Sequence, residues 1–183
     1  TDWQTFALGL KVARELKGEH VAKSLVGALP SLPVDRQPAF LVALADRGDK
    51  AAVPAITASA KVGAPPIRLA AIEALGRIGD ASAVPVLISA ATGEQGDLAA
   101  AAKTALITMK GPGTQEAIIA ALDQDNAAIK KIAAQVLGDR HAAAASPHIK
   151  KLLGDAGDDL RAAAIEALGK CAAPADLPAL TGI

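Results

Sequence analysis

The chain has 183 residues, of which 45 are alanine and only three, Trp3, Phe6 and Phe40, are aromatic. Nineteen acidic residues balance nineteen lysine and arginine residues, so no net charge draws the chain to nucleic acid or to an anionic membrane. A hydrophobic content of 51% excludes an intrinsically disordered chain. Abundant alanine favours helices over strands, and no apolar run approaches the ~20 residues that span a bilayer.

Residues 1–32 are predicted to form a first pair of helices, near 3–17 and 19–29. This pair contains two of the three aromatic residues, and it has Ala13 where a leucine recurs in the rest of the chain. A pair that departs from the pattern at one end is typical of a repeat that caps a stack. We therefore predict an N-terminal capping helix pair.

From residue 33 onward the sequence repeats with a step of 31 residues. One column of this repeat is always leucine, at Leu44, Leu75, Leu106, Leu137 and Leu168. A second column is always aliphatic, at Ile56, Leu87, Ile118, Ile149 and Leu180. A period of this length indicates stacked structural units. The predicted repeats are 33–63, 64–93, 94–124, 125–154 and 155–183.

The unit at 64–93 shows how one repeat is predicted to fold. Between Ile67 and Ile78, apolar residues recur at positions i, i+3, i+4, i+7, i+8 and i+11, which form one stripe of an α-helix. Gly79 then ends this helix. Pro85 falls in the first turn of a second helix, where proline is tolerated. Each unit is therefore helix, short turn, helix and linker, and neighbouring units must stack to bury their apolar faces.

The run Ile67–Asp80, followed by Ala83–Leu87, resembles the HEAT-like repeat of the bilin-lyase type, and Asp159–Lys170 is a second good match. The unit at 94–124 departs most, with Lys103 and Ile107 where an apolar residue and a glycine are usual. Together, the period and the resemblance predict an all-α fold. We expect one domain over 1–183, a right-handed α-solenoid, or α-α superhelix, of about six HEAT-like helical hairpins.

The resemblance implies little about activity, because such repeats occur in chromophore lyases, protein-binding scaffolds, a DNA glycosylase family and deoxyhypusine hydroxylase. In the hydroxylase, His-Glu pairs hold iron. None of His20, His141 and His148 is followed by glutamate, and strong metal sites need three or four convergent ligands. We predict neither a metal ion nor a cofactor.

The remaining candidates for chemistry are interpreted as structural. Cys171 shares the last buried column of the first helix with Ile78 and Met109, so it is predicted to be a core residue and not a reactive thiolate. The stretch 111–113, Gly-Pro-Gly, lacks the lysine and Ser/Thr of a P-loop and is predicted to form a turn. We predict no catalytic residues and expect that the chain is not an enzyme.

A candidate binding surface lies on the second helices, which line the concave face of a solenoid. The positions predicted to line this groove are Ala55, Ser59, Val86, Ser89, Ala117, Ala121, His148 and Lys151. The groove becomes basic in the unit at 125–154, which has five basic residues against two acidic ones. Two interpretations stay open, since small side chains permit close approach of a partner but alanines also simply favour helix.

We predict a non-catalytic protein–protein interaction scaffold, a module of a longer chain that binds a protein or peptide. The alternative is an accessory or subunit of a bilin-lyase-like enzyme that holds a chromophore or its acceptor protein. Nucleic acid is an unsuitable partner, because aromatic residues are few and positive charge is concentrated in one unit. No membrane insertion is expected, and the compartment stays open between cytoplasm and periplasm. A flanking domain or further repeats are expected to cover Leu177 and Leu180.

Overall fold

Six first helices and five second helices make up most of the described part of the chain. The computed structural model describes residues 2–16, 18–155 and 157–171. The first helices of the hairpins are α1 (Trp3–Glu15), α3 (Gln37–Arg47), α5 (Pro65–Ile78), α7 (Asp97–Thr108), α9 (Ala127–Asp139) and α11 (Asp158–Cys171). The second helices are α2 (Glu19–Ala28), α4 (Val53–Val62), α6 (Val84–Gly93), α8 (Thr114–Ala121) and α10 (Ser146–Asp155). Short 3₁₀ turns precede three of the second helices, at Lys50–Ala52, Ala81–Ala83 and Ala143–Ala145, and another follows α2, at Leu29–Ser31.

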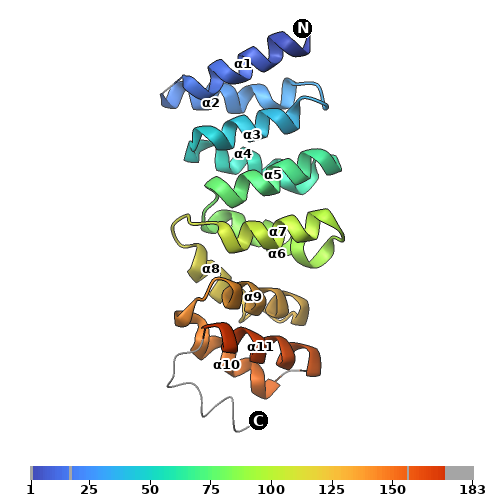
Figure 1. The fold of residues 1–183 in the computed structure, drawn as a ribbon, viewed down its shortest axis with the longest axis vertical. Helices are drawn as coiled ribbons and strands as arrows, with labels where there is room; N and C mark the ends of the chain where they lie inside the picture. The colour runs from blue at the N-terminus through green and yellow to red at the C-terminus, as the bar shows by residue number, and fades with distance from the viewer. Residues whose placement is uncertain (1, 17, 156, 172–183) are drawn as a thin grey trace.

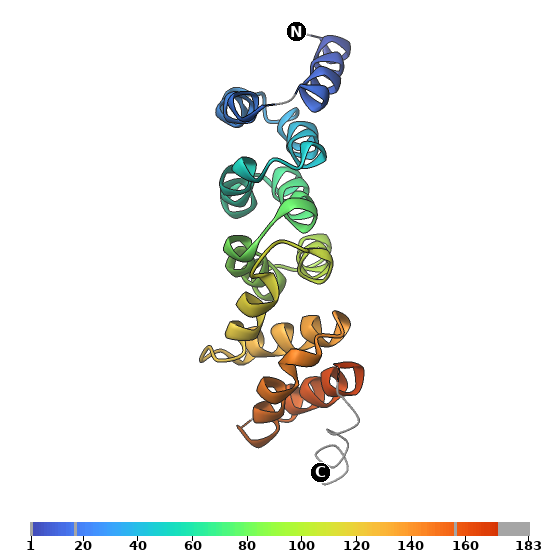
Figure 2. The ribbon, with the colours of Figure 1, turned by 90° about the vertical axis from the view of Figure 1, so that its left-hand side faces the viewer.

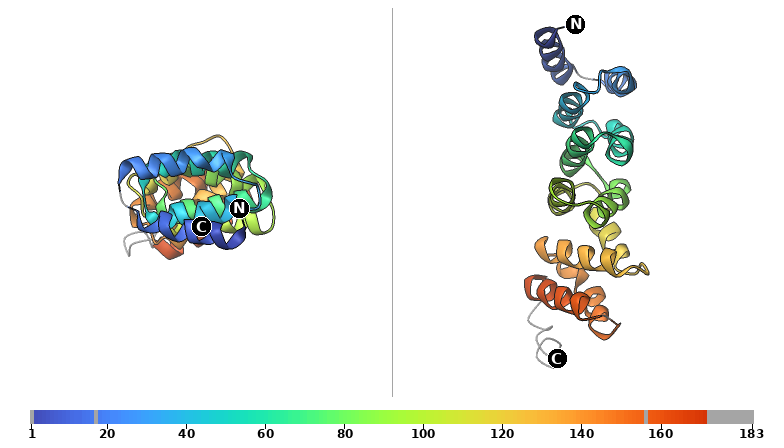
Figure 3. Two further views of the ribbon diagram at one scale, coloured as in Figure 1. Left: turned by 90° about the horizontal axis from the view of Figure 1, so that it is seen from above. Right: turned by 90° about the vertical axis from the view of Figure 1, so that its right-hand side faces the viewer.

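The helices form an elongated stack in which the chain advances one hairpin at a time (Figure 1). Figure 2 shows the first helices in one column and the second helices in the other. The views from above and from the opposite side show the same two-column arrangement (Figure 3). No strand occurs among the described residues. The predicted all-α solenoid of helical hairpins is therefore confirmed.

The side chains at the two repeating sequence positions, the leucine position and the aliphatic position, form the core between the first helices and the second helices. The leucines of the first column are at most 2% exposed. In the second column, the four residues from Ile56 to Ile149 are completely buried, whereas Leu180 lies outside the described residues. Complete burial of an aliphatic side chain contributes about 1.5–3 kcal/mol, so these columns supply much of the stability of the stack.

The hairpin of α5 and α6 shows how local sequence sets the ends of each helix. Two prolines occupy the first turn of α5, where the missing N–H groups have no helical partner. The N–H of Gly79 donates to the Leu75 carbonyl and ends the helix. The Asp80 carboxylate then accepts from the backbone N–H of Ser82 at 2.9 Å and caps the following turn. The end of α5 at Gly79 lies where the sequence predicted it.

The first helix is the least covered element of the stack. It buries only Leu10 and Ala13, and Leu8 is 63% exposed on its outer side. Trp3 is also largely exposed, although its ring packs against Phe6 with a centroid distance of 5.4 Å. Capping repeats usually present a polar outer face, so the apolar surface of α1 is unusual for an end of a solenoid.

None of the described helices has the length and apolarity needed to cross a bilayer.

Candidate functional site

The predicted groove residues lie on α4, α6, α8 and α10, which form one side of the stack (Figure 2). Ser89 and Lys151 are exposed, and four others are half-buried, namely Ala55, Ser59, Ala117 and His148. Val86 and Ala121 are buried, with 7% and 1% of their surface exposed. These two side chains are therefore largely covered within the stack, although Val86 still lines the cleft between α4 and α6.

A cleft of about 450 Å³ lies on this side, between α4 and α6. Its lining residues are Ala60, Lys61, Arg68, Pro85, Val86, Ser89, Ala90 and Glu94. Arg68 and Glu94 form an ion pair of 2.6 Å in its wall. Arg68 also donates from Nε to the Ala60 carbonyl at 3.1 Å, so this wall is held in place by both neighbouring units. The remaining surface of the cleft comes mainly from small side chains, which leave room for a peptide backbone.

The same side becomes basic at α10. Lys151 is exposed there, and His148 is half-buried. The His148 Nδ1 atom is buried and has no hydrogen-bond partner among the described residues. Among the described side chains of α10, Lys151 is therefore the exposed cation that a partner can reach.

A second surface feature originates in the way the first helices pack. Gly76 of α5 lies against Ala105 of α7, and a Cβ atom at Gly76 would be 3.0 Å from the Ala105 Cα. Gly138 of α9 lies against Ala167 of α11 in the same manner, with a corresponding distance of 2.8 Å. Both pairs combine two of the smallest residues, which lets the helices approach closely. They sit at equivalent positions two repeats apart.

The equivalent pair between α7 and α9 is large. Ile107 replaces the glycine and Val136 replaces the alanine. Correspondingly, α7 and α9 contact each other far less than α5 contacts α7 or α9 contacts α11. A cleft of about 840 Å³ opens beside this junction. Its lining residues are Gly76, Arg77, Ile107, Thr108, Met109, Lys110, Gln115, Asp139 and Arg140.

Arg140 bridges the loose junction between α7 and α9. Its Nη1 atom donates to the carbonyls of Leu106, Ile107 and Met109 at 2.7, 3.0 and 2.9 Å, which satisfies the C-terminal end of α7. Burial lowers the pKa of the Arg140 guanidinium from its ordinary value. Three repeats earlier, Arg47 donates to two carbonyls at the end of α1 in the same way. The α1–α3 junction is also sparsely packed, so an arginine ties the helix ends together at both weak junctions.

A column of charged residues runs along the ends of the first helices. Asp46 pairs with Arg77 of the next repeat at 2.5 Å, and Asp139 pairs with Lys170 of the next repeat at 2.8 Å. Between these two pairs the column holds Thr108, which is uncharged and exposed. The α7–α9 cleft lies at this interruption.

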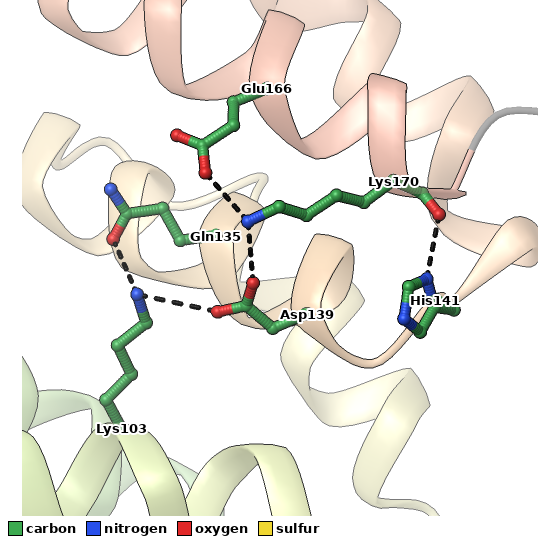
Figure 4. Close-up of polar contacts among 6 residues, drawn as sticks. All are labelled: Lys103, Gln135, Asp139, His141, Glu166 and Lys170. Atoms are coloured by element: carbon green, nitrogen blue, oxygen red, sulfur yellow. Dashed lines mark hydrogen bonds and ion pairs between the residues drawn. The ribbon is translucent and has the colours of Figure 1, made fainter.

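Figure 4 shows the charges around Asp139 at the edge of the cleft. Its second oxygen pairs with Lys103 at 3.5 Å, while Lys170 also pairs with Glu166 at 2.7 Å. Burial raises the pKa of Asp139, but the hydrogen bond from Lys170 and the charges of Lys103 and Lys170 outweigh it and hold that pKa below 3.8. The same bonds to Asp139 and Glu166 raise the pKa of Lys170. Asp139 is therefore ionised and its charge is neutralised within the fold.

The other residues considered for chemistry have structural surroundings. Cys171 is buried, and its carbonyl accepts from Ser146 Oγ at 3.3 Å. The stretch 111–113 is a turn between α7 and α8, as predicted, and Gly111 lies so close to Gly79 that no side chain fits. The His141 ring contacts the Lys170 carbonyl through Nδ1 at 2.9 Å. Within the described ranges, no three His, Cys, Asp or Glu side chains come together as a metal site would require.

The helical hairpins stack on one another with clefts between consecutive units, and each hairpin contributes one helix to each of two columns. This is the architecture of an α-solenoid. Residues 22–107 and 115–183 match the family model for HEAT repeats. The chain therefore belongs to the HEAT-repeat family, and the resemblance seen in Ile67–Leu87 is confirmed. No curated protein matches the chain.

Three solved structures illustrate what the chain is similar to. Human deoxyhypusine hydroxylase, bound to glycerol, is 19% identical with a TM-score of 0.46, and the match covers 100% of this chain and 84% of that one. The CpcE–CpcF complex of phycocyanin lyase from Nostoc is 20% identical with a TM-score of 0.43, covering 82% and 99%. An engineered protein is 19% identical with a TM-score of 0.47, covering 93% and 92%.

These comparisons correct one prediction. We expected from the sequence that the chain is not an enzyme, yet two of the three similar structures are named as a hydroxylase and a lyase. The prediction that the chain is not an enzyme is therefore withdrawn. At such identities the similarity describes the fold, so the bilin-lyase-like role stays a prediction.

Proposed function

We propose that the chain is a protein-interaction scaffold that holds a segment of a partner along its second-helix side. The observation that carries this proposal is the cleft of about 450 Å³ between α4 and α6, on the side where solenoids usually bind their partners. Ser89 is exposed beside it, and Ala60 and Ala90 leave its floor shallow enough for a backbone to approach closely.

The charges on this side favour a partner segment with acidic residues. Lys61 is exposed at the α4–α6 cleft, and Lys151 is exposed on α10. Glu94 in the cleft wall is already paired with Arg68, so its charge does not oppose an incoming carboxylate. Complementary charge mainly steers a partner and selects it among competitors. The occupant we propose is therefore a segment with small apolar residues at α4–α6 and carboxylates towards α10.

Site-specific photo-crosslinking tests this proposal in an extract of the source cells. A benzoylphenylalanine at Ser89 and another at Lys151 are expected to trap the same protein. The same group at Glu73, an exposed position of the first helix α5, serves as the control and is expected not to trap it. Equal trapping from both sides of the stack, or no trapping from Ser89 and Lys151, would contradict the proposal.

The trapped protein is then purified and titrated against the full chain. Ser89→Arg, which fills the cleft, is expected to weaken binding at least tenfold, since truncated or blocked anchor pockets commonly lose 2 kcal/mol or more. Lys151→Glu is expected to weaken it by a smaller, salt-dependent factor. Unchanged affinity in both variants would show that the partner binds elsewhere.

A further inference from the structure

The α7–α9 cleft carries an excess of positive charge. Arg77, Lys110 and Arg140 line it, against a single carboxylate, Asp139, in its described lining. Both oxygens of Asp139 are already paired with lysines, at 2.8 and 3.5 Å. The charge of Asp139 is therefore compensated inside the fold. Arg77 pairs with Asp46 outside the cleft, whereas Lys110 has no acidic partner among the described residues.

Two of these cations have hydrogen-bond donors to spare. Lys110 is exposed and has no ion-pair or hydrogen-bond partner among the described residues. Arg77 is 52% exposed and uses Nη2 for Asp46, which leaves further N–H groups of its guanidinium unused. Gln115 adds an amide at the same cleft. Ammonium, guanidinium and amide groups are the donors that carboxylate and phosphate oxygens accept from most strongly.

The repeat pattern shows that the column of charged residues is interrupted at this cleft. At the α3–α5 junction, Asp46 meets Arg77, and at the α9–α11 junction, Asp139 meets Lys170. At the α5–α7 junction the same column places Thr108 next to Arg77. The Thr108 hydroxyl donates to the Thr104 carbonyl of its own helix, at 3.0 Å, so it supplies no charge to Arg77. Among the residues that the structure describes, Arg77 therefore has one acidic partner, Asp46 of the preceding repeat, and receives no second one from α7.

We propose that the α7–α9 cleft binds a small anion with two or more carboxylate or phosphate groups, which Arg77 and Lys110 contact. Its volume of about 840 Å³ lies within the range of roughly 300–1,000 Å³ that small-molecule sites have. Arg140 fixes the floor of the cleft through the α7 carbonyls and adds to the positive field. The site lies at the ends of the first helices, and it does not depend on partner binding along the second helices.

Isothermal titration of the full chain with citrate, and separately with pyrophosphate, tests this site at low ionic strength. The unmodified chain is expected to bind at least one of the two probes saturably with one site per chain. Lys110→Glu is expected to weaken that binding by at least about tenfold, because it replaces a charge-assisted hydrogen bond with a repulsion. The probe that binds more tightly identifies whether the site prefers carboxylate or phosphate.

Thr108→Glu provides a sharper variant, because it places a carboxylate of the chain itself beside Arg77 in the lining of the cleft. This variant is expected to abolish binding of the probe. Thr108→Gln, which has the same size without the charge, is expected to retain binding within about threefold. Loss of binding in Thr108→Gln as well would overturn the assignment of Arg77 and Lys110 as the anion-binding pair.

Lys11→Glu is the matched control for charge, because Lys11 is exposed on α1 and does not line the cleft. It changes the net charge by the same amount as Lys110→Glu and is expected to leave probe affinity within about twofold. Equal weakening by both variants would show a diffuse field in place of a site. Absence of saturable binding of both probes to the unmodified chain would also overturn the proposal. Circular dichroism confirms that each variant is folded before it is titrated.

Discussion

The contact between Gly138 and Ala167 allows the packing of the first helices to be tested by adding a single methyl group. A Cβ atom at Gly138 would lie 2.8 Å from the Cα and 3.1 Å from the Cβ of Ala167. The Cα atom belongs to the backbone, so α11 as a whole must move to accommodate it. Overpacking of this kind costs about 1–3 kcal/mol. Replacing glycine by alanine within a helix returns up to about 1 kcal/mol.

Gly9→Ala supplies the matched control, because Gly9 lies in the middle of α1 and an added Cβ meets no atom within 4 Å. Both variants gain the same helix propensity, so the difference between them isolates the steric cost. We expect Gly138→Ala to be about 1–3 kcal/mol less stable than Gly9→Ala. For a chain of this size the difference corresponds to roughly 2–12 °C in melting temperature.

Urea unfolding followed by far-ultraviolet circular dichroism measures both variants under the same conditions. Repeat proteins can unfold in segments, so the fluorescence of Trp3 is recorded in parallel as a probe of the N-terminal end. Gly76→Ala, which faces Ala105 in the same manner, is expected to behave like Gly138→Ala. If Gly138→Ala were as stable as Gly9→Ala, close approach of α9 and α11 would not limit the packing, and the explanation of the looser α7–α9 junction would fail.

Two further predictions concern the charged residues of the first helices. Arg140→Met introduces methionine, the residue found at the equivalent position 109. It is expected to lower the free energy of unfolding by about 1.5–3 kcal/mol, because the carbonyls at the end of α7 lose a charged donor. Unchanged stability in urea would contradict this expectation. The pKa values of Asp46 and Asp139 are lowered in the fold, so their ion pairs stabilise the chain above the ordinary value of 3.8 and lose that effect as the pH falls below it. An Asp46→Asn, Asp139→Asn double variant is therefore expected to lose less stability than the unmodified chain between pH 5 and pH 2, and parallel losses in thermal melts would refute the assignment.

The core was predictable because it depends on residue types that recur. The leucine at position 75 and its equivalents are buried wherever the structure describes them, since a period of 31 residues forces each to face the neighbouring unit. Helix ends followed from local chemistry in the same way, as Gly79 and the capping carboxylate of Asp80 show.

The surface was less predictable, because exposure depends on which helices meet from other repeats. Val86 was predicted to line the groove on the second helices, yet only 7% of its surface is exposed. Lys103 and Ile107 were recognised as departures from the repeat, but their effect could not be derived from one unit. The effect of Ile107 depends on Val136 of the opposite helix, and the effect of Lys103 depends on the charge of Asp139 in the next repeat.

Arg140 was the functional residue that the sequence analysis missed, although a signal for it was present. It occupies the column that elsewhere holds Ile78, Met109 and Cys171, all of which are buried. An arginine in a mainly apolar column indicates a carbonyl or carboxylate that needs a donor. The same signal identifies Arg47, three repeats earlier, so arginines in buried columns mark the loose junctions of this stack.

Both clefts depend on the stacking of 31-residue hairpins into an elongated solenoid. Small-angle X-ray scattering of the full chain measures this stacking directly. A compact globule of 183 residues has a radius of gyration of about 16 Å. The solenoid predicts a clearly larger radius and an asymmetric pair-distance distribution with a long tail. A radius close to that of the compact globule, with a symmetric distribution, would contradict the stacked arrangement and the clefts that depend on it.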